Sequence, residues 1–569
     1  MAGAGSGKTA TLTGRLIHLL SSGITPSRIV AITFTNKAAS EMKQRVASAS
    51  SQSVDSVFIG TFHSFCSRLL RREATRLSRR PNFTIFDDSD KNRLLRRLLK
   101  EMGIPTKELS LSLASAFISR IKNNMPVPAG LIPKQTSRLE NLFARYEAAL
   151  IINNAFDFDD LISKVVFLFK SNPSLLAKYQ NLFSYFLVDE YQDVNPVQYW
   201  LIKLLVGNSG RLNVVGDDSQ AIYGFRGADV RTFLQFNKDF PSAETVILDQ
   251  NYRSTKNIIE AASGLISKNK EQLAKQLWTE HATGEPIKVI EHADEDEEAV
   301  WLVNFLLSNP DSSSRTILYR TNAQSRPLEQ ALIEANIPYE LFGGLHFYER
   351  KEIKDIVAAL RLASNPADSV SLERLDKNLY RAPFRRLRDT LPNQATSLSP
   401  QDLVSYIVEA GEFVDLIRRR FDNADERLEN INELINFAGK FSALSEFLEK
   451  ISLFAGSDLS SSRVKSSAPS AVSLMTIHMA KGLEFDEVYI AGCSEGLLPH
   501  HRSLSSNPEL EEERRLMYVA MTRARRKLTL SFYDLPSRFL SDIPSTYLSI
   551  ESKDRFLDFD DEMRYITID

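Results

Sequence analysis

The 569-residue sequence contains only two cysteines, Cys66 and Cys493, which cannot build a disulfide framework and argue against a four-ligand zinc site. No apolar run is long enough to span a bilayer, and the first residues lack the charged and apolar regions of a signal peptide. An excess of one charge is also absent, because 70 Lys and Arg face 72 Asp and Glu, for a net charge of −2. These absences predict a large intracellular protein without a membrane anchor. They exclude a globally basic DNA-binding protein but leave room for a local basic groove.

Short apolar runs alternate with helical patterns in the first part of the chain. Residues 29–34 (IVAITF) form a β-branched run that is typical of a buried parallel strand. A second run ends at Asp189 and Glu190, and a third covers residues 212–215. Strands that alternate with helices predict an α/β sheet whose ligands lie at the carboxyl ends of the strands.

Two stretches interrupt this alternation with helical patterns. The first is rich in Arg (RREATRLSRR, KNRLLRRLLK) and is interpreted as an inserted subdomain, the alternative being a solvated helix face. The second ends in a Ser-rich segment that is typical of a linker. At roughly 150 residues per domain the length predicts about four domains. The predicted parts are a first lobe (1–69 and 155–251), its helical insertion (70–154), a second lobe (252–366 and 471–569) and its short helical insertion (367–470).

The segment AGAGSGKT carries the Gly-Lys-Thr end of a phosphate-binding loop. Its glycines let backbone N–H groups turn toward phosphate oxygens, and the following helix presents its positive end. Lys8 is predicted to reach the β- and γ-phosphates, and Thr9 to hold Mg²⁺. The alternative is an ordinary glycine-rich turn. The predicted nucleotide-binding residues here are Ala2, Gly3, Ala4, Gly5, Ser6, Gly7, Lys8, Thr9 and Ala10.

Adjacent carboxylates follow an apolar run in VDEYQDVN. One carboxylate can bind Mg²⁺ while its neighbour orients and activates water, as phosphoryl transfer requires. Asp189 is therefore predicted as a metal ligand and Glu190 as the catalytic base. Such a pair is often only a helix cap, but its occurrence with Lys8 and Thr9 in one chain favours catalysis.

Eleven short motifs follow one another along the chain: AGAGSGKT, AITFTNKAA, GTFHSFC, DFDDLI, VDEYQDVN, VVGDDSQAIYGFRGA, LDQNYRS, LYRTNAQSR, GGLHFYERKEIKD, LMTIHMAKGLEFDEV and EEERRLMYVAMTRAR. In these motifs and their order the sequence resembles the superfamily I DNA helicases of the UvrD/PcrA/Rep type over nearly its whole length. The resemblance implies two RecA-like P-loop lobes with parallel sheets, each interrupted by a helical insertion. It also implies ATP and Mg²⁺ as cofactors, and 3′-to-5′ helicase activity on single-stranded DNA and single/double-strand junctions in repair, recombination or replication.

The resemblance also implies roles for matching residues of the ATPase site. Gln220 would contact the γ-phosphate and couple its state to the DNA site. Tyr252 would stack on adenine, and Arg253 would reach the γ-phosphate. Glu484 would bind the ribose, and Arg523 would act as an arginine finger. The alternative for either arginine alone is a surface or ion-pair role.

Aromatic side chains beside polar and basic groups in GTFHSFC and AIYGFRG fit a track for single-stranded DNA, because bases stack on aromatic rings. Phe225 replaces the tryptophan more usual in the family, which predicts a smaller stacking area. The alternative for Phe34, and for Phe62 in GTFHSFC, is a place in the core. By resemblance, the residues lining the strand would be Phe34, Thr61, His63, Tyr223, Phe225, Arg226 and His478.

The sequence departs from the family pattern at several places. It starts at the phosphate loop, without the preceding strand and the upstream glutamine motif, which leads us to expect that Met1 is not the natural start. Ala10 stands where relatives carry an arginine against adenine, so nucleotide affinity is expected to differ. The second insertion is short, which is expected to alter unwinding, and no long tail follows residues 536–548.

These departures leave a second function open: a nucleotide-dependent DNA clamp or anti-recombination factor without efficient hydrolysis. A helicase-nuclease subunit is disfavoured because no nuclease segment follows the last motif. The Ser-rich composition favours a nuclear location, with bacterial cytoplasm or an organelle as alternatives. The sequence identifies no protein partner.

Overall fold

The computed structural model describes residues 1–49, 56–105, 108–127, 131–207, 211–309, 314–342, 346–366, 368–448, 451 and 472–551. The chain divides into two compact units. Unit 1 comprises Met1–Tyr252 and Lys270–Trp278, and unit 2 comprises Arg253–Asn269 and Thr279–Asp569. The sequence analysis placed all of 252–366 in the second lobe. Residues 270–278 instead pack with unit 1, because Leu277 lies against the phosphate loop at Gly3.

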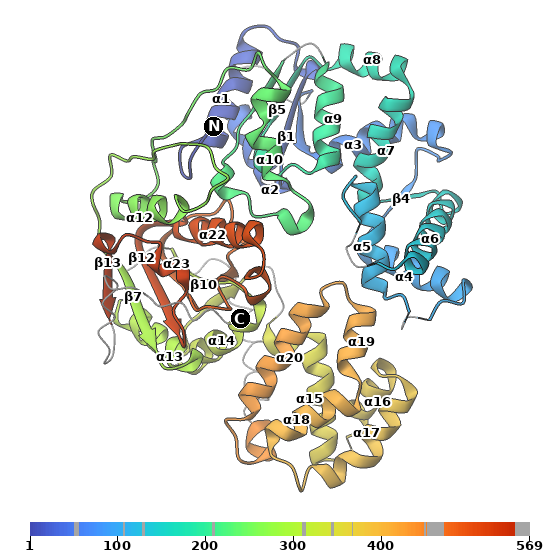
Figure 1. Ribbon diagram of the computed structural model, residues 1–569, viewed down its shortest axis with the longest axis vertical. Coiled ribbons are helices and arrows are strands. Elements are labelled where there is room, and N and C mark those ends of the chain that lie inside the picture. The colour runs from blue at the N-terminus through green and yellow to red at the C-terminus, as the bar shows by residue number, and fades with distance from the viewer. Residues whose placement is uncertain are drawn as a thin grey trace. The chain divides into compact units, whose positions relative to one another are not determined.

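The sheet of unit 1 has four parallel strands in the order β2-β1-β5-β6. The apolar runs predicted as strands form it, with ends that differ from the prediction by one or two residues. Figure 1 shows α1 on one side of β1 and β5, and α3, α7 and α9 on the other. The strands are β1 (Ile29–Thr33), β2 (Phe58–Thr61), β5 (Tyr185–Val188) and β6 (Leu212–Val214), and the helices are α1 (Lys8–Ser21), α2 (Asn36–Ala49), α3 (Phe62–Glu73), α7 (Phe158–Ser171), α8 (Pro173–Leu182), α9 (Pro196–Val206), α10 (Val230–Leu234) and α11 (Phe236–Asp239).

The central strands β1 and β5 are buried at all but one position, which explains why their sequences are largely apolar. Successive side chains of a strand point to opposite faces. Ile29 and Ala31 of β1 accordingly join the core beneath α1 and α2. Val30 and Ile32 join the core formed with α3, α7, α8 and α9. The two layers of helices thus hold the carboxyl ends of the strands in place, where the predicted site residues lie.

β6 forms one edge of the sheet, and β5 is its only strand partner in the described part of the chain. The first residues continue alongside this edge: Ala2 N donates to Gly216 O at 3.0 Å, and Gly3 N donates to Leu248 O at 3.0 Å. Leu248 N in turn donates to Met1 O at 2.8 Å. A cavity of about 300 Å³ opens beside them, lined by Met1, Leu12, Val214, Phe233, Val246 and Leu248 among others.

The first insertion has its own core. It consists of α4 (Asp88–Glu101), α5 (Leu111–Lys122) and α6 (Pro133–Ile152), and the parallel strands β3 (Thr84–Phe86) and β4 (Ala155–Asp157) join it to the rest of unit 1. Lys122 is buried where α5 meets β4 and α7. Its ammonium lies 2.8 Å from Asp157 and 2.9 Å from Asp160, so a buried ion pair ties the insertion to unit 1.

Unit 2 contains a parallel sheet of seven strands in the order β13-β7-β12-β11-β8-β10-β9. The acidic run at 294–298 forms the start of α13, with Asp294 as the N-cap. The strands are β7 (Ile287–His292), β8 (Arg315–Tyr319), β9 (Tyr339–Leu341), β10 (Val472–Thr476), β11 (Phe485–Ile490), β12 (Ala524–Tyr533) and β13 (Leu548–Glu551), and the helices are α12 (Lys256–Ile266), α13 (Glu295–Ser308), α14 (Ser325–Glu334), α22 (Asn507–Met521) and α23 (Arg538–Ser541).

The second insertion is a helical body whose core includes α15 (Lys351–Ser364). The sequence analysis assigned that helix to the second lobe, but its buried face packs with the insertion helices. The Ser-rich linker predicted at the end of this insertion lies outside the described residues. The remaining helices are α16 (Ser369–Asn378), α17 (Arg381–Gln394), α18 (Pro400–Ala410), α19 (Phe413–Arg420) and α20 (Ala424–Ala438).

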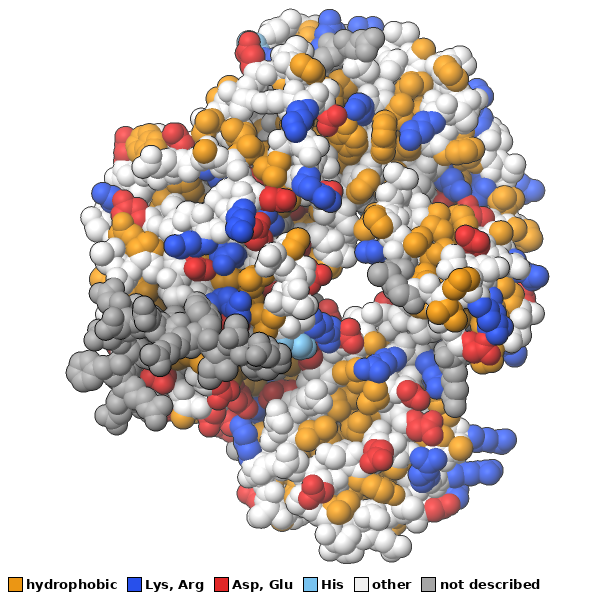
Figure 2. Space-filling view, in the orientation of Figure 1, with side chains coloured by type: hydrophobic (Ala, Val, Ile, Leu, Met, Phe, Trp, Pro, Cys, Tyr) orange, Lys and Arg blue, Asp and Glu red, His pale blue; other side chains and the backbone are white. Residues whose placement is uncertain are grey.

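Basic and acidic side chains are interspersed on the face that Figure 2 shows, in keeping with the nearly neutral composition. A search for membrane-spanning helices among the described residues finds no helix with the necessary length and hydropathy.

Candidate nucleotide and DNA sites

The phosphate loop runs from Ala2 to the start of α1. Gly5 and Gly7 have φ angles of 64° and 84°, a left-handed conformation that favours glycine. Gly7 is the N-cap of α1. The backbone N–H groups of the first turn of α1 therefore have no partner within the helix and can donate to a ligand. Ser6 Oγ donates to Gly3 O at 2.9 Å and closes the loop on itself. This backbone geometry is suited to an anion, which is the ligand that the sequence predicted for the loop.

Lys8 begins α1, and its side chain is 10% exposed. Its Nζ lies 3.7 Å from Asp217 Oδ2, too far for a hydrogen bond, and meets no hydrogen-bond acceptor in the described part of the chain. A buried ammonium normally finds acceptors, because leaving one unsatisfied costs roughly 1–3 kcal/mol or more. Lys8 is therefore placed to receive an anionic oxygen.

Thr9 and Asp189 lie together although they are 180 residues apart. Thr9 Oγ1 donates to Asp189 Oδ2 at 3.3 Å. Burial, followed by the negative charge of Glu190, raises the pKa of Asp189 to about 6. A cation would relieve both effects, so this hydroxyl and carboxylate fit a hard divalent ion such as Mg²⁺. The predicted metal ligands are thus brought together.

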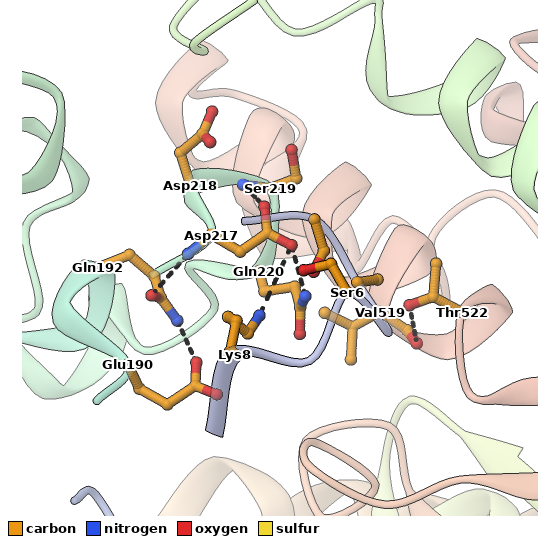
Figure 3. A network of polar contacts seen from close by, with 12 residues as sticks. Ser6, Lys8, Glu190, Gln192, Asp217, Asp218, Ser219, Gln220, Val519 and Thr522 are labelled. Carbon is orange, nitrogen blue, oxygen red and sulfur yellow. Dashed lines mark hydrogen bonds and ion pairs between the residues drawn. The ribbon is translucent and has the colours of Figure 1, made fainter. Parts of the chain in front are cut away.

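Glu190 follows β5 in the left-handed region, with a φ of 49°. Gln192 Nε2 donates to Glu190 Oε2 at 2.5 Å, and Gln192 Oε1 accepts from Asp217 N at 2.9 Å (Figure 3). Gln192 therefore joins the predicted base to the GDDSQ segment. Sequence reasoning missed it, although its place in the VDEYQDVN motif was a signal that could have found it.

The GDDSQ segment places its polar side chains around Asp217, which is fully buried. Gln220 Nε2 donates to Asp217 Oδ2 at 2.5 Å, and Ser219 N donates to Asp217 Oδ1 at 3.2 Å. Figure 3 shows Lys8 and Gln220 turned toward the same carboxylate. Gln220 and the phosphate loop are therefore brought together, as the prediction requires.

Ala10 and Tyr252 are the predicted adenine-side residues of unit 1. Tyr252 N donates to Gly5 O at 3.0 Å, which fixes this residue beside the phosphate loop. Its ring is largely exposed, with 64% of its surface accessible, and its hydroxyl donates to Gln250 Oε1 at 2.8 Å. Ala10 is exposed on the first turn of α1. An exposed ring anchored at the loop can stack on a planar base.

Arg253, Glu484 and Arg523 belong to unit 2. Arg253 Nε donates to Glu484 Oε2 at 2.7 Å, and Arg525 also pairs with Glu484. Although partial burial opposes it, these hydrogen bonds from Arg525 and Arg253 lower the pKa of Glu484. Arg523 is only 1% exposed and donates to the carbonyl oxygens of Val519 and Leu483 at 2.9 and 3.0 Å. Glu484 and Arg253 are thus together, whereas the structure shows Arg523 buried and bonded to backbone carbonyl oxygens.

An aromatic cluster in unit 1 contains four of the predicted DNA-binding residues. The rings of Phe34 and Tyr223 are stacked with centroids 4.9 Å apart, and Phe225 lies 5.9 Å from Tyr223. The guanidinium of Arg226 lies 5.4 Å from the centroids of both Tyr223 and Phe225. Phe225 is 66% exposed, so a base could stack on its ring.

Residues of the GTFHSFC segment make contacts that stabilise unit 1. Thr61 caps α3 by accepting from Ser64 N at 3.3 Å, so it has a structural role whatever else it binds. His63 contacts Phe158, with ring centroids 5.5 Å apart, and burial lowers its pKa, opposed by Asp159. Phe62 is 4% exposed and belongs to the core, which confirms the alternative considered for it. His478 lies in unit 2, in the turn that follows β10.

Comparison with known proteins yields two family matches. Residues 1–241 match the UvrD/REP helicase N-terminal domain, and residues 246–419 and 409–534 match the UvrD-like helicase C-terminal domain. The chain is also 36% identical to the ATP-dependent DNA helicase PcrA of Staphylococcus aureus strain Mu50, over 97% of this chain and 85% of that protein. It is 37% identical to the protein of the same name from Staphylococcus epidermidis strain ATCC 12228, over 96% of this chain and 84% of that protein.

Proposed function

Because this chain belongs to the UvrD-like helicase family, we propose that it is an ATP-dependent DNA helicase that moves along single-stranded DNA. The observation that carries the proposal is the buried ammonium of Lys8. It lies at the N-terminus of α1 with no acceptor in the described part of the chain, beside the backbone N–H groups of the first helical turn, which have no partner within the helix. Phosphate oxygens are the ligands that satisfy all of these donors at once.

The residues around Lys8 fit a magnesium nucleotide. Thr9 and Asp189 supply two oxygen ligands, and the cation, when bound, neutralises charge on the phosphates. Glu190 orients a water molecule and accepts its proton, while Gln192 holds the Glu190 carboxylate in position. Gln220 senses the γ-phosphate, and its hydrogen bond to Asp217 joins that sensor to Lys8.

The roles of Tyr252, Arg253, Glu484 and Arg523 are part of the same proposal. Tyr252 stacks on adenine, Glu484 binds the ribose, and the two arginines bring positive charge to the phosphates. Glu484 already forms ion pairs with Arg253 and Arg525. To bind the ribose and the phosphates, Glu484 and Arg253 must therefore break these ion pairs and contact the nucleotide instead.

The DNA partner of this proposal is single-stranded DNA, including single/double-strand junctions. Stacking on the Phe34, Tyr223 and Phe225 cluster provides binding without sequence preference, and Arg226 adds a positive charge beside it. We place the protein in repair, recombination or replication. The nuclear location favoured by composition is not supported, because the relatives described above are bacterial. We propose bacterial cytoplasm instead.

The test is ATP hydrolysis by the whole chain with and without oligothymidine. We expect DNA to stimulate turnover, and Lys8→Ala to abolish turnover while DNA binding is retained. Lys43→Ala, which removes an exposed lysine on α2, is the matched control and should behave as wild type. A folded protein that binds DNA but shows no turnover would contradict the helicase and support the clamp function.

A further inference from the structure

Lys275 is a buried cation of the nucleotide site that neither the motifs nor the family resemblance singled out. It lies in the segment Lys270–Trp278, which packs with unit 1 although the chain on both sides of it belongs to unit 2. Its side chain is 8% exposed. Its ammonium contacts Asp217 Oδ1 and lies 2.7 Å from Asp218 Oδ1.

The whole segment is held against the phosphate loop and the GDDSQ turn. Leu273 N donates to Asp218 Oδ2 at 2.9 Å. Trp278 O accepts from Asn251 N at 2.7 Å. Leu277 covers Gly3 so closely that a Cβ there would lie 2.1 Å from its Cδ2. Lys275 is therefore fixed by its neighbours rather than by its ion pairs alone.

Two lysines share Asp217. Lys275 contacts Oδ1, whereas Oδ2 accepts from Gln220 and lies 3.7 Å from Lys8 Nζ. Burial alone would lower the pKa of Lys275, but the charges of Asp217 and Asp218 raise it, so this side chain is a permanent cation. The positive charges of Lys275 and Lys8, in turn, lower the pKa of Asp217 although burial opposes them.

We infer that Lys275 is a positioning residue that neutralises Asp217 and Asp218, so that Lys8 is free to bind phosphate. Two buried carboxylates destabilise the fold unless positive charges lie beside them. Without Lys275, Lys8 is the remaining lysine at Asp217 and is drawn toward it and away from the phosphate oxygens. The residue thus acts through Asp217 on nucleotide affinity, and the inference rests on the proposed function.

The experiment compares equilibrium binding of a fluorescent ATP analogue with ATP turnover in the full chain. Lys275→Met should raise the dissociation constant and the KM for ATP at least tenfold, with a smaller change in kcat. Lys275→Arg keeps the charge and should stay within about threefold of wild type. Lys268→Met, which removes an exposed lysine in the turn after α12, is the matched control.

A double-mutant cycle separates positioning from a merely structural role. If Lys275 acts through Asp217, Asp217→Asn should recover most of the nucleotide affinity lost in Lys275→Met. It also removes one of the two buried charges that Lys275 neutralises, so the double variant gives a second route to the measurement if Lys275→Met does not fold. Affinity equal to that of Lys268→Met, or a loss that Asp217→Asn does not relieve, would overturn the inference. Absence of ATP binding by the wild-type chain would instead overturn the proposed function.

Discussion

Asp189 shows at the scale of one residue how a functional group costs stability. Its pKa is raised from 3.8 to about 6 by burial and by Glu190. The folded protein binds the carboxyl proton more tightly than the unfolded chain does. The carboxyl group therefore stabilises the fold at pH values below the pKa it has in the unfolded chain, and this stabilisation is lost as pH rises through the pKa it has in the folded protein. At pH 8 the ionised group therefore costs the nucleotide-free protein on the order of 2 kcal/mol. We expect Asp189→Asn to raise the free energy of unfolding by about that amount at pH 8 and by much less at pH 4.

Urea unfolding at the two pH values, without nucleotide or Mg²⁺, measures this difference. ATP turnover by the same variant should be lost, because the amide is a poor ligand for a hard cation. Asp376→Asn, at an exposed position of α16, is the control and should change stability equally little at both pH values. An equal gain for Asp189→Asn at pH 4 and pH 8 would show that burial of its charge is not the cause.

Phe225 provides the corresponding test for DNA binding. Its exposed ring lies beside Tyr223 and Arg226, and loss of one base–aromatic stack costs roughly 1–3 kcal/mol. Phe225→Ala should therefore weaken oligothymidine binding about tenfold or more in fluorescence anisotropy, whereas Phe225→Trp should strengthen it. Phe167→Ala removes another exposed ring, on α7, and should leave binding unchanged. Equal affinities for the two alanine variants would remove Phe225 from the DNA track.

The residues that the sequence could predict are those within contiguous motifs. Lys8 and Thr9 follow a glycine pattern, and Asp189 ends an apolar strand, so local spacing was enough. Lys275 is 58 residues from Asp217 in the chain and belongs to no recognised spacing, so only the folded chain reveals its ion pairs. The burial of Arg523 was equally invisible, because its carbonyl partners depend on packing in unit 2.

At the scale of elements, the central strands of the unit 1 sheet were predictable because burial on two faces leaves continuous apolar runs. The elements at the edges of the sheets were harder to predict. β13 at one edge of the unit 2 sheet has a pattern of partly and fully exposed residues, and no strand was predicted there. The start of the second insertion was placed too late, since the apolar face of α15 does not reveal which core it joins.

The edge of the unit 1 sheet allows a prediction about stability. The cavity beside β6 is lined mainly by apolar side chains, and two of its lining residues are joined by a hydrogen bond from Met1 N to Val246 O at 2.6 Å. Four β-branched residues added before Met1 should extend the ladder that Ala2 and Gly3 begin, and should fill this cavity. Burial of their side chains, less the cost of ordering them, should raise stability by about 2 kcal/mol and the melting temperature by several degrees.

Thermal unfolding of the extended protein measures this gain. An extension of equal length made of Gly and Ser is the matched control, because it moves the N-terminal charge equally far but buries little apolar surface. Burial lowers the pKa of the Met1 ammonium, so moving that charge outward should itself add a small gain, and both extensions share it. Equal melting temperatures for the two extensions would show that the cavity does not accept a strand.

At the scale of the whole molecule, the ordered motifs were the strongest signal in the sequence, because eleven short patterns in one order are improbable by chance. They led to the family that the comparisons show. The motifs did not reveal that the chain returns to unit 1 at Lys270–Trp278. That excursion depends on contacts of Lys275 and Leu277 with residues far away in the sequence.

The direction of movement is the last prediction. By its resemblance to the family we expect translocation from 3′ to 5′, and streptavidin bound to one end of single-stranded DNA reports it. The protein should displace streptavidin from the 5′ end in an ATP-dependent manner and leave it at the 3′ end, because a motor pushes only what lies ahead of it. Lys8→Ala should displace neither. Faster displacement from the 3′ end would reverse the polarity, and displacement from neither end by a chain that hydrolyses ATP would mean that turnover is not coupled to movement.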